Sequence, residues 1–157
     1  MKIKLVCVGK TGKDFLEKGE EEYIKRLVKY VPFEKIEILD IKNAKKLTHE
    51  QVKEQEGTAI LNKIQSGDHL VLLDDKGKMY TSVQFADYYQ NLFNRGIKTT
   101  VFVIGGPYGF SETVYQRANE KLSLSKMTFS HQMIRLFFLE QTYRAMTILR
   151  NEPYHHE

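Results

Sequence analysis

The sequence predicts a single α/β domain with a mostly parallel sheet flanked by helices. Short β-branched runs alternate along its 157 residues with longer amphipathic stretches, the pattern of strand–helix–strand units. Residues 71–73 and 101–104 are apolar without interruption, as in central parallel strands covered on both faces. No linker, repeat or low-complexity tract divides the chain, and its length suits one domain with its own core.

Five stretches fit strands, namely residues 3–8, 35–41, 69–73, 99–104 and 121–125. Helices are predicted over residues 13–30, from Thr48 onward, after Thr81 through 85–93, from Ser111 to Arg117, and over about 130–149. Thr48 and Thr81 each begin a Thr-x-x-Gln capping box, and Ser111 is a candidate cap. The last helix carries apolar residues on more than one face, so it must be buried on several sides, either in the core or against a second subunit.

Composition excludes several classes of protein. Hydrophobic residues make up 41% and charged residues 28% of the chain, which fits neither a disordered tail nor a fibrous protein. No apolar run reaches the roughly 18 residues that a membrane span needs, and charge follows the first residues too soon for a secretory signal. We therefore expect a cytoplasmic protein. Cys7, the one cysteine, lies in an apolar run and is expected in the core.

The net charge of +4 points weakly to an anionic partner. Residues 1–46 hold 12 basic and 8 acidic side chains, and the rest of the chain holds equal numbers of each. Lysines of this segment, such as Lys10, Lys13 and Lys18, could contact the phosphates of a polyanion. The alternative is an ordinary solvated helix surface.

Residues 9–13, Gly-Lys-Thr-Gly-Lys, follow the first strand but do not form a phosphate loop. A Walker loop needs four residues between its glycines and a Ser or Thr after the lysine, whereas two residues intervene here and Asp14 follows. This spacing argues against a nucleotide hydrolase.

Three predicted strands end in segments that suit a ligand. Residues 105–112, Gly-Gly-Pro-Tyr-Gly-Phe-Ser-Glu, follow the strand at 99–104, residues 122–131 follow the last strand, and 72–75, Leu-Leu-Asp-Asp, end a third. Ligands of open α/β sheets bind outside the carboxyl ends of the strands, and apolar walls with a few hydrogen-bonding groups suit an adenosine-like molecule. Each segment alone is also explained as a turn or a helix cap.

The last helix and the tail carry conspicuous polar residues. His131 and Arg135 lie on nearly one face and Arg144 on the opposite side, although an ion pair with Glu140 four residues earlier would also explain Arg144. After Pro153, Tyr154 and His155 are a plausible pair for base stacking and proton transfer, or simply a frayed end. No spacing of His, Cys or carboxylates predicts a metal site.

These segments together closely resemble the ribosomal RNA large subunit methyltransferase H family. The resemblance rests on residues 103–109, on 122–135, on 140–145 (Glu-Gln-Thr-Tyr-Arg-Ala), on the closing Pro-Tyr-His at 153–155, and on the Lys-Ile-Lys-Leu-Val-Cys-Val-Gly-Lys start. It spans essentially the whole chain. The loop departs from some relatives in having Pro and Tyr after its two glycines.

The resemblance implies a SPOUT-type α/β knot over residues 1–157, a C-terminal trefoil knot and an obligate homodimer. It implies that S-adenosyl-L-methionine is the cofactor and that N3 of a pseudouridine in 23S ribosomal RNA is methylated in the assembled ribosome, with no metal and no membrane partner. It places cofactor contacts at Leu73, Gly105, Leu124, Ser125, Lys126, Met127, Thr128 and Phe129. It gives catalytic or RNA-positioning roles to Arg144, Tyr154 and His155.

Two other functions remain open from the sequence. One is a related knotted methyltransferase that acts on transfer RNA or on another ribosomal nucleotide. The other is a non-catalytic ribosome-binding or assembly factor that keeps the fold. Cofactor binding separates the second from the methyltransferases.

Overall fold

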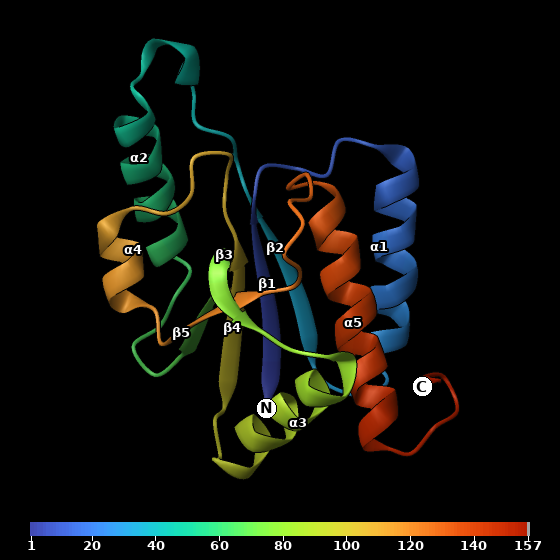
Figure 1. Ribbon diagram of the computed structural model, residues 1–157. Helices are drawn as coiled ribbons and strands as arrows, with labels where there is room; N and C mark the ends of the chain where they lie inside the picture. Colours follow the sequence, from blue (N-terminus) through green and yellow to red (C-terminus); the bar gives the residue numbers. More distant parts are fainter. Residues whose placement is uncertain (157) are drawn as a thin grey trace.

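A wholly parallel five-stranded sheet in the order β2-β1-β4-β3-β5 lies at the centre of the computed structural model, which describes residues 1–156 (Figure 1). The strands are β1 (Lys2–Val8), β2 (Phe33–Ile38), β3 (His69–Met79), β4 (Thr99–Ile104) and β5 (Glu120–Ser123). The helices are α1 (Asp14–Leu27), α2 (His49–Leu61), α3 (Ser82–Asn94), α4 (Glu112–Arg117) and α5 (Met133–Leu149), with a short 3-10 turn at Ala44–Lys46. The predicted fold class is confirmed.

Helices cover both faces of this sheet, which explains the uninterrupted apolar strands. Side chains alternate between the faces, so Leu5 and Phe102 point into a core shared with α1, α3 and α5. Val6 and Val103 point into a second core beneath α2 and α4. Strand order does not define how the chain threads, so the trefoil knot remains a prediction of the resemblance.

Three helices, α2, α3 and α4, begin at the predicted caps, whereas α1 and α5 are shorter than predicted and have no side-chain cap. Both capping boxes form, since the hydroxyl of Thr48 accepts the amide of Gln51 at 3.1 Å and the hydroxyl of Thr81 accepts the amide of Gln84 at 3.1 Å. The hydroxyl of Ser111 accepts the amide of Val114 at 3.4 Å. Local side-chain chemistry therefore sets where these helices begin.

Three strands differ from the prediction by more than one residue. β5 ends at Ser123 rather than at residue 125, and the changes in β2 and β3 follow from their neighbours. β2 begins at Phe33, where it pairs with Ile3, and ends before the predicted residue 41. β3 runs past the predicted 69–73 to Met79, because a bulge lets Leu73 and Lys78 both pair with Leu122 of β5. Gly77 allows this close approach, since an added Cβ would lie 2.5 Å from backbone atoms of Leu122.

Cys7 is a core residue, as predicted. Its side chain is buried in β1, and burial raises the pKa of its thiol to about 12. The thiolate that nucleophilic chemistry requires is therefore scarce at neutral pH.

The last helix is partly a core helix and partly exposed. Phe138, Leu139 and Ala145 are buried against the sheet and its other helices, whereas Met133 and Phe137 are 42% and 38% exposed. The structure thus accounts for one apolar face of α5 inside the chain and leaves another at the surface. In residues 1–156, the structure contains no helix whose length and apolar character would let it span a membrane.

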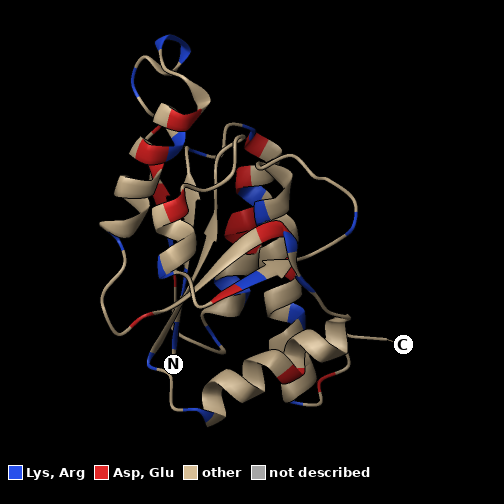
Figure 2. Cartoon of the chain, turned by 60° about the vertical axis from the view of Figure 1, so that its left-hand side comes forward, with Lys and Arg blue, Asp and Glu red and all other residues tan. Residues whose placement is uncertain are grey.

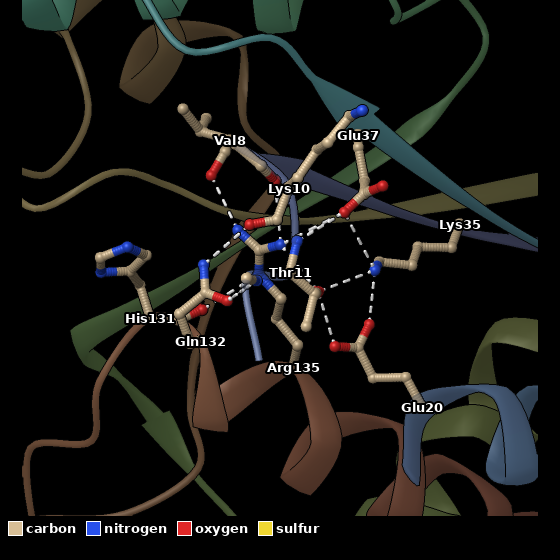
Figure 3. A network of polar contacts seen from close by, with 11 residues as sticks. Val8, Lys10, Thr11, Glu20, Lys35, Glu37, His131, Gln132 and Arg135 are labelled. Atoms are coloured by element: carbon tan, nitrogen blue, oxygen red, sulfur yellow. Dashed lines mark hydrogen bonds and ion pairs between the residues drawn. The ribbon is translucent and has the colours of Figure 1, made fainter. Parts of the chain in front are cut away.

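The fully buried guanidinium group of Arg135, in the first turn of α5, ties this helix to the end of β1 (Figure 3). Its nitrogens donate to the carbonyl oxygens of Val8 at 2.8 Å, Gly9 at 2.9 Å and His131 at 3.1 Å. Buried donors without acceptors cost several kcal/mol. The three carbonyls therefore fix where α5 starts relative to β1.

Carboxylates and a hydroxyl surround this arginine. The hydroxyl of Thr11 accepts from Arg135 at 3.1 Å and donates to Glu20 at 2.7 Å. The ammonium of Lys35 lies 2.5 Å from Glu20 and 3.3 Å from Glu37, whose carboxylate lies 3.6 Å from Arg135. The loop after β1 is thus held by a network of alternating charges rather than shaped as a phosphate loop.

Replacing Arg135 should destabilise the fold strongly. Arg135→Ala leaves the buried carbonyls of Val8 and Gly9 without this donor and Glu37 without one of its two cations. We expect a loss of about 3–5 kcal/mol in the free energy of unfolding. Urea unfolding followed by circular dichroism measures it. The exposed Arg95→Ala variant should stay within about 0.5 kcal/mol of wild type, and an equal loss in both variants would contradict the role given to Arg135.

The same network predicts a pH dependence. Burial alone would raise the pKa of Glu37, but the amide of Thr11 and the two neighbouring cations outweigh it and lower this pKa below its ordinary value. The stabilisation of the fold by ionised Glu37 is therefore complete above the unfolded-state pKa of this residue. It is lost as the pH falls through the folded-state pKa. Between pH 5 and 3, Glu37→Gln should lose less stability than wild type on acidification. Glu21→Gln, an exposed control, should lose as much as wild type.

Candidate functional site

A cavity of about 520 Å³ lies where β3, β4 and β5 end. Its walls are residues 73–76, 104–110, 122–125 and 127–129, with Tyr115, His131 and Ile134. The three strand ends named from the sequence therefore do meet in one place, at the carboxyl edge of the sheet, where open α/β folds bind ligands. The volume is in the range of small-molecule sites.

Apolar side chains and small polar groups share this cavity. Of the eight residues predicted as cofactor contacts, seven line it, namely Leu73, Gly105, Leu124, Ser125, Met127, Thr128 and Phe129. Lys126 does not line it, and its side chain is exposed. At Gly105 an added Cβ would lie 2.9 Å from the ring of Phe110, so the loop after β4 can pack this tightly only around a glycine.

The carboxylate of Asp74 is one of the groups that line the cavity. Asp74 accepts the hydroxyl of Tyr115 at 2.5 Å and the amide of Lys76 at 2.8 Å. Burial would raise the pKa of Asp74, but these hydrogen bonds lower it below its ordinary value. Burial and the same bond to Asp74 raise the pKa of Tyr115 to about 12. The cavity therefore carries a fixed negative charge that would favour a cationic ligand group.

The predicted catalytic residues form a separate cluster around Glu140. One carboxylate oxygen of Glu140 accepts from Arg144 at 2.6 Å and 3.0 Å and from the hydroxyl of Tyr154 at 3.1 Å. The guanidinium carbon of Arg144 lies 4.7 Å from the centre of the Tyr154 ring. The structure thus brings Arg144 and the tail together, and the ion pair that offered an alternative explanation of Arg144 is also present.

Arg144 also contacts the histidine of the tail. Nη1 of Arg144 lies 3.1 Å from Nδ1 of His155. Arginine can only donate, so Nδ1 of His155 is the acceptor in this contact.

Tyr23 belongs to the same cluster, although nothing in the sequence indicates it. Its hydroxyl oxygen lies 3.5 Å from that of Tyr154, and α1 and α5 pack side by side (Figure 1). Burial, followed by the contacts with Tyr23 and Glu140, raises the pKa of Tyr154, which stays a neutral phenol. Glu140 could be suspected from its spacing to Arg144, but Tyr23 reaches the tail only through the packing of two helices.

The cavity and the cluster lie at opposite ends of α5. Ile134 lines the cavity, and Arg144 is ten residues further along the helix, which corresponds to about 15 Å at 1.5 Å per residue. Within one chain, a ligand in the cavity is therefore not in contact with the cluster.

Other predicted features lie outside both groups. Lys10, Lys13 and Lys18 are exposed, around the start of α1. Over the described residues 1–156, no group of three or more His, Cys, Asp or Glu side chains has a geometry that could hold a metal ion.

Comparisons with known proteins identify close relatives of the whole chain. The family described as "Predicted SPOUT methyltransferase" matches residues 1–155. A Parabacteroides distasonis protein named Ribosomal RNA large subunit methyltransferase H is 59% identical over 157 residues, 100% of both chains. Proteins of the same name from Flavobacterium johnsoniae and Bacteroides thetaiotaomicron are 56% and 54% identical over 157 residues, again 100% of both chains. A crystal structure of Archaeoglobus fulgidus Nep1 bound to S-adenosylhomocysteine covers 54% of this chain and 37% of its own, with 19% identity and a TM-score of 0.40.

Glu140 should hold the tail in place. Glu140→Gln removes the charge that binds Arg144 and weakens the acceptor for Tyr154, and hydrogen bonds to charged groups contribute about 1.5–3 kcal/mol. We expect amide hydrogen exchange over residues 151–156 to become roughly tenfold faster or more. Glu50→Gln breaks an ion pair with Lys53 within α2, which packs on the other face of the sheet. Unchanged exchange in Glu140→Gln, or equal acceleration in Glu50→Gln, would contradict this role.

Proposed function

This chain belongs to the SPOUT methyltransferase family, and from that premise we propose that it methylates N3 of a pseudouridine in 23S ribosomal RNA. The methyl donor is S-adenosyl-L-methionine, and the substrate is the assembled ribosome in the cytoplasm. Close relatives carry the name of a ribosomal RNA methyltransferase over their full length. The proposal treats residues 1–157 as one methyltransferase domain with a knotted C-terminal part.

The observation that carries the proposal is the cavity at the ends of β3, β4 and β5. Seven of the eight residues assigned to the cofactor by resemblance line this one cavity, although they come from three separate segments of the chain. An RNA-binding or assembly factor without catalysis would not need a small-molecule cavity at this place. This favours the methyltransferase over the non-catalytic alternative.

The residues of the cavity fit the cofactor. Leu124 and Phe129 offer apolar walls for an adenine ring, Ser125 offers a hydroxyl, and Asp74 offers a negative charge to the cationic end of the molecule. The cofactor supplies a methyl group made electrophilic by its sulfonium charge. The chain's part is to hold that group, exclude water and align it with the nucleophile at about 3–3.5 Å.

The cluster around Glu140 supplies the groups that the RNA base requires. N3 of pseudouridine is a weak acid, so its proton must leave as the nitrogen takes the methyl carbon. In the proposed reaction His155 turns Nδ1 away from Arg144 and accepts this proton. The same movement frees Arg144 to stabilise the developing anion or to bind a phosphate, while Tyr154 stacks on or positions the base.

The separation of cavity and cluster supports a homodimer. Met127 and Met133, which are 75% and 42% exposed, and Phe129 and Phe137, at 37% and 38%, surround the cavity end of α5. The ring centres of Phe129 and Phe137 lie 4.9 Å apart, so these two rings form one exposed apolar patch. A second subunit would cover it and could bring its own Arg144 and tail to this cavity.

Methyl transfer from labelled S-adenosyl-L-methionine tests the proposal. The substrates are assembled ribosomes lacking the modification, free 23S ribosomal RNA and transfer RNA, and the labelled nucleotide is then mapped. Label on N3 of a pseudouridine in ribosomes alone is the expected result. Label on transfer RNA would favour the related methyltransferase, and cofactor binding without transfer to any substrate would refute the proposed reaction.

Removal of the imidazole of His155 should slow the reaction without weakening cofactor binding. For His155→Ala we expect kcat to fall by about 10²–10⁴, the usual contribution of a general base. The cofactor dissociation constant should not change, because His155 does not line the cavity of its own chain and the proposed reaction gives it a role toward the base rather than the cofactor. His156→Ala, at an exposed neighbouring position, is the control. A wild-type kcat in His155→Ala would exclude it as the base.

A further inference from the structure

A basic tip projects beyond the carboxyl edge of the sheet, between β2 and α2. Residues 41–48 form it, with the 3-10 turn Ala44–Lys46 at its centre, and Figure 2 shows lysine and arginine colour gathered there above α2. This segment holds Lys42, Lys45 and Lys46 and no acidic residue. The whole tip therefore presents one sign of charge.

The lysine side chains of the tip make no polar contacts that would stabilise the fold. All three are exposed, and in the part of the chain that the structure describes none of their ammonium groups has a salt bridge or a side-chain hydrogen bond. The nearest acidic residue that follows, Glu50, is already paired with Lys53 at 2.7 Å. Three unneutralised cations on a short ordered turn can bind phosphates without first breaking internal ion pairs.

A stacked pair of rings joins this tip to the cavity. His49, which follows the tip as the first residue of α2, stacks on Tyr108 of the loop after β4, with ring centres 3.8 Å apart and planes 16° from parallel. Tyr108 is 43% exposed and also lines the cavity. An aromatic platform of this kind is what unpaired nucleobases stack on.

We propose that residues 42–49 and Tyr108 form a binding surface for the RNA substrate. The three lysines bind backbone phosphates, and the His49–Tyr108 pair stacks on an unpaired base beside the target nucleotide. This inference rests on the proposed function, because it places the RNA at the mouth of the cavity from which the methyl group would be transferred. Phosphates together with exposed base faces are the chemistry that cations next to aromatic rings recognise.

The test compares two triple variants that change the charge equally. One replaces Lys42, Lys45 and Lys46 by Gln. The control replaces Lys29, Lys63 and Lys98 by Gln, three exposed lysines that precede β2, β3 and β4 and so lie at the opposite edge of the sheet. Affinity for assembled ribosomes is measured from 50 to 300 mM salt, together with the KM for ribosomes and the affinity for S-adenosyl-L-methionine.

The tip variant should show a slope of log K against log salt that is shallower by about 2–3 than that of wild type, as expected for three lost phosphate contacts. Its KM for ribosomes should rise, and its cofactor affinity should stay at the wild-type value, because none of the three lysines lines the cavity. The control should keep the wild-type slope. A tip variant with the wild-type slope and KM would overturn the inference.

Tyr108 gives a second, independent readout. Tyr108→Leu removes the aromatic face and should weaken ribosome binding by roughly tenfold, the usual effect of losing one base stack. Tyr108→Phe keeps the ring and should restore most of that loss. Equal loss in both variants, or none in Tyr108→Leu, would overturn the stacking part of the inference.

The binding measurement separates this inference from the proposed function. The tip variant could bind ribosomes with a shallower salt dependence than wild type while wild type itself transfers no methyl group. The RNA surface then stands and the proposed reaction fails. If wild type methylates ribosomes and the tip variant binds them with an unchanged slope, the proposed reaction stands and the surface is wrong.

Discussion

The buried guanidinium group of Arg135 is the contact on which the functional end of the molecule depends. A charge without solvent is costly unless its donors are satisfied, and here the carbonyls of Val8, Gly9 and His131 satisfy them at 2.8–3.1 Å. The first two belong to the start of the chain and the third to the segment that leads into α5. Since β5 fixes one end of the 124–131 segment and Arg135 fixes the other, this segment is held beside the ends of β3 and β4, where it lines the cavity.

Helix α5, which carries Arg135 in its first turn, also sets the distance between the cavity and the cluster around Glu140. Its first turn borders the cavity, and Glu140 and Arg144 hold the tail about 15 Å further along. A rigid helix cannot shorten this distance, so the cavity and the cluster around Glu140 of one chain stay apart. A dimer in which each subunit serves the other's cavity is the simplest arrangement that unites them, and it would cover the exposed apolar residues at the same end of α5.

Sequence reasoning succeeds here where the determinant is local. A few neighbouring residues are enough to predict the capping boxes at Thr48 and Thr81, the apolar central strands and the glycine-rich loop after β4. It fails where the determinant is distant. Two of the three carbonyls that accept from Arg135 lie more than 120 residues away in the sequence, and β3 is extended by a bulge that depends on β5. Neither the contact of Tyr23 with Tyr154 nor the His49–Tyr108 stack has a local signal. Lys126 belongs to the same motif as the residues of the cavity, but its side chain is exposed and does not line it, which the motif alone does not indicate.

The central claim, that the ends of β3, β4 and β5 form the cofactor site, is tested most directly by amide hydrogen exchange with and without saturating S-adenosylhomocysteine. Ligand should slow exchange over residues 73–76, 104–110 and 122–129, the three segments that line the cavity, and should leave the amino-terminal edge of the sheet unchanged. Protection that appears elsewhere, or saturating binding that protects none of these three segments, would contradict the placement of the cofactor.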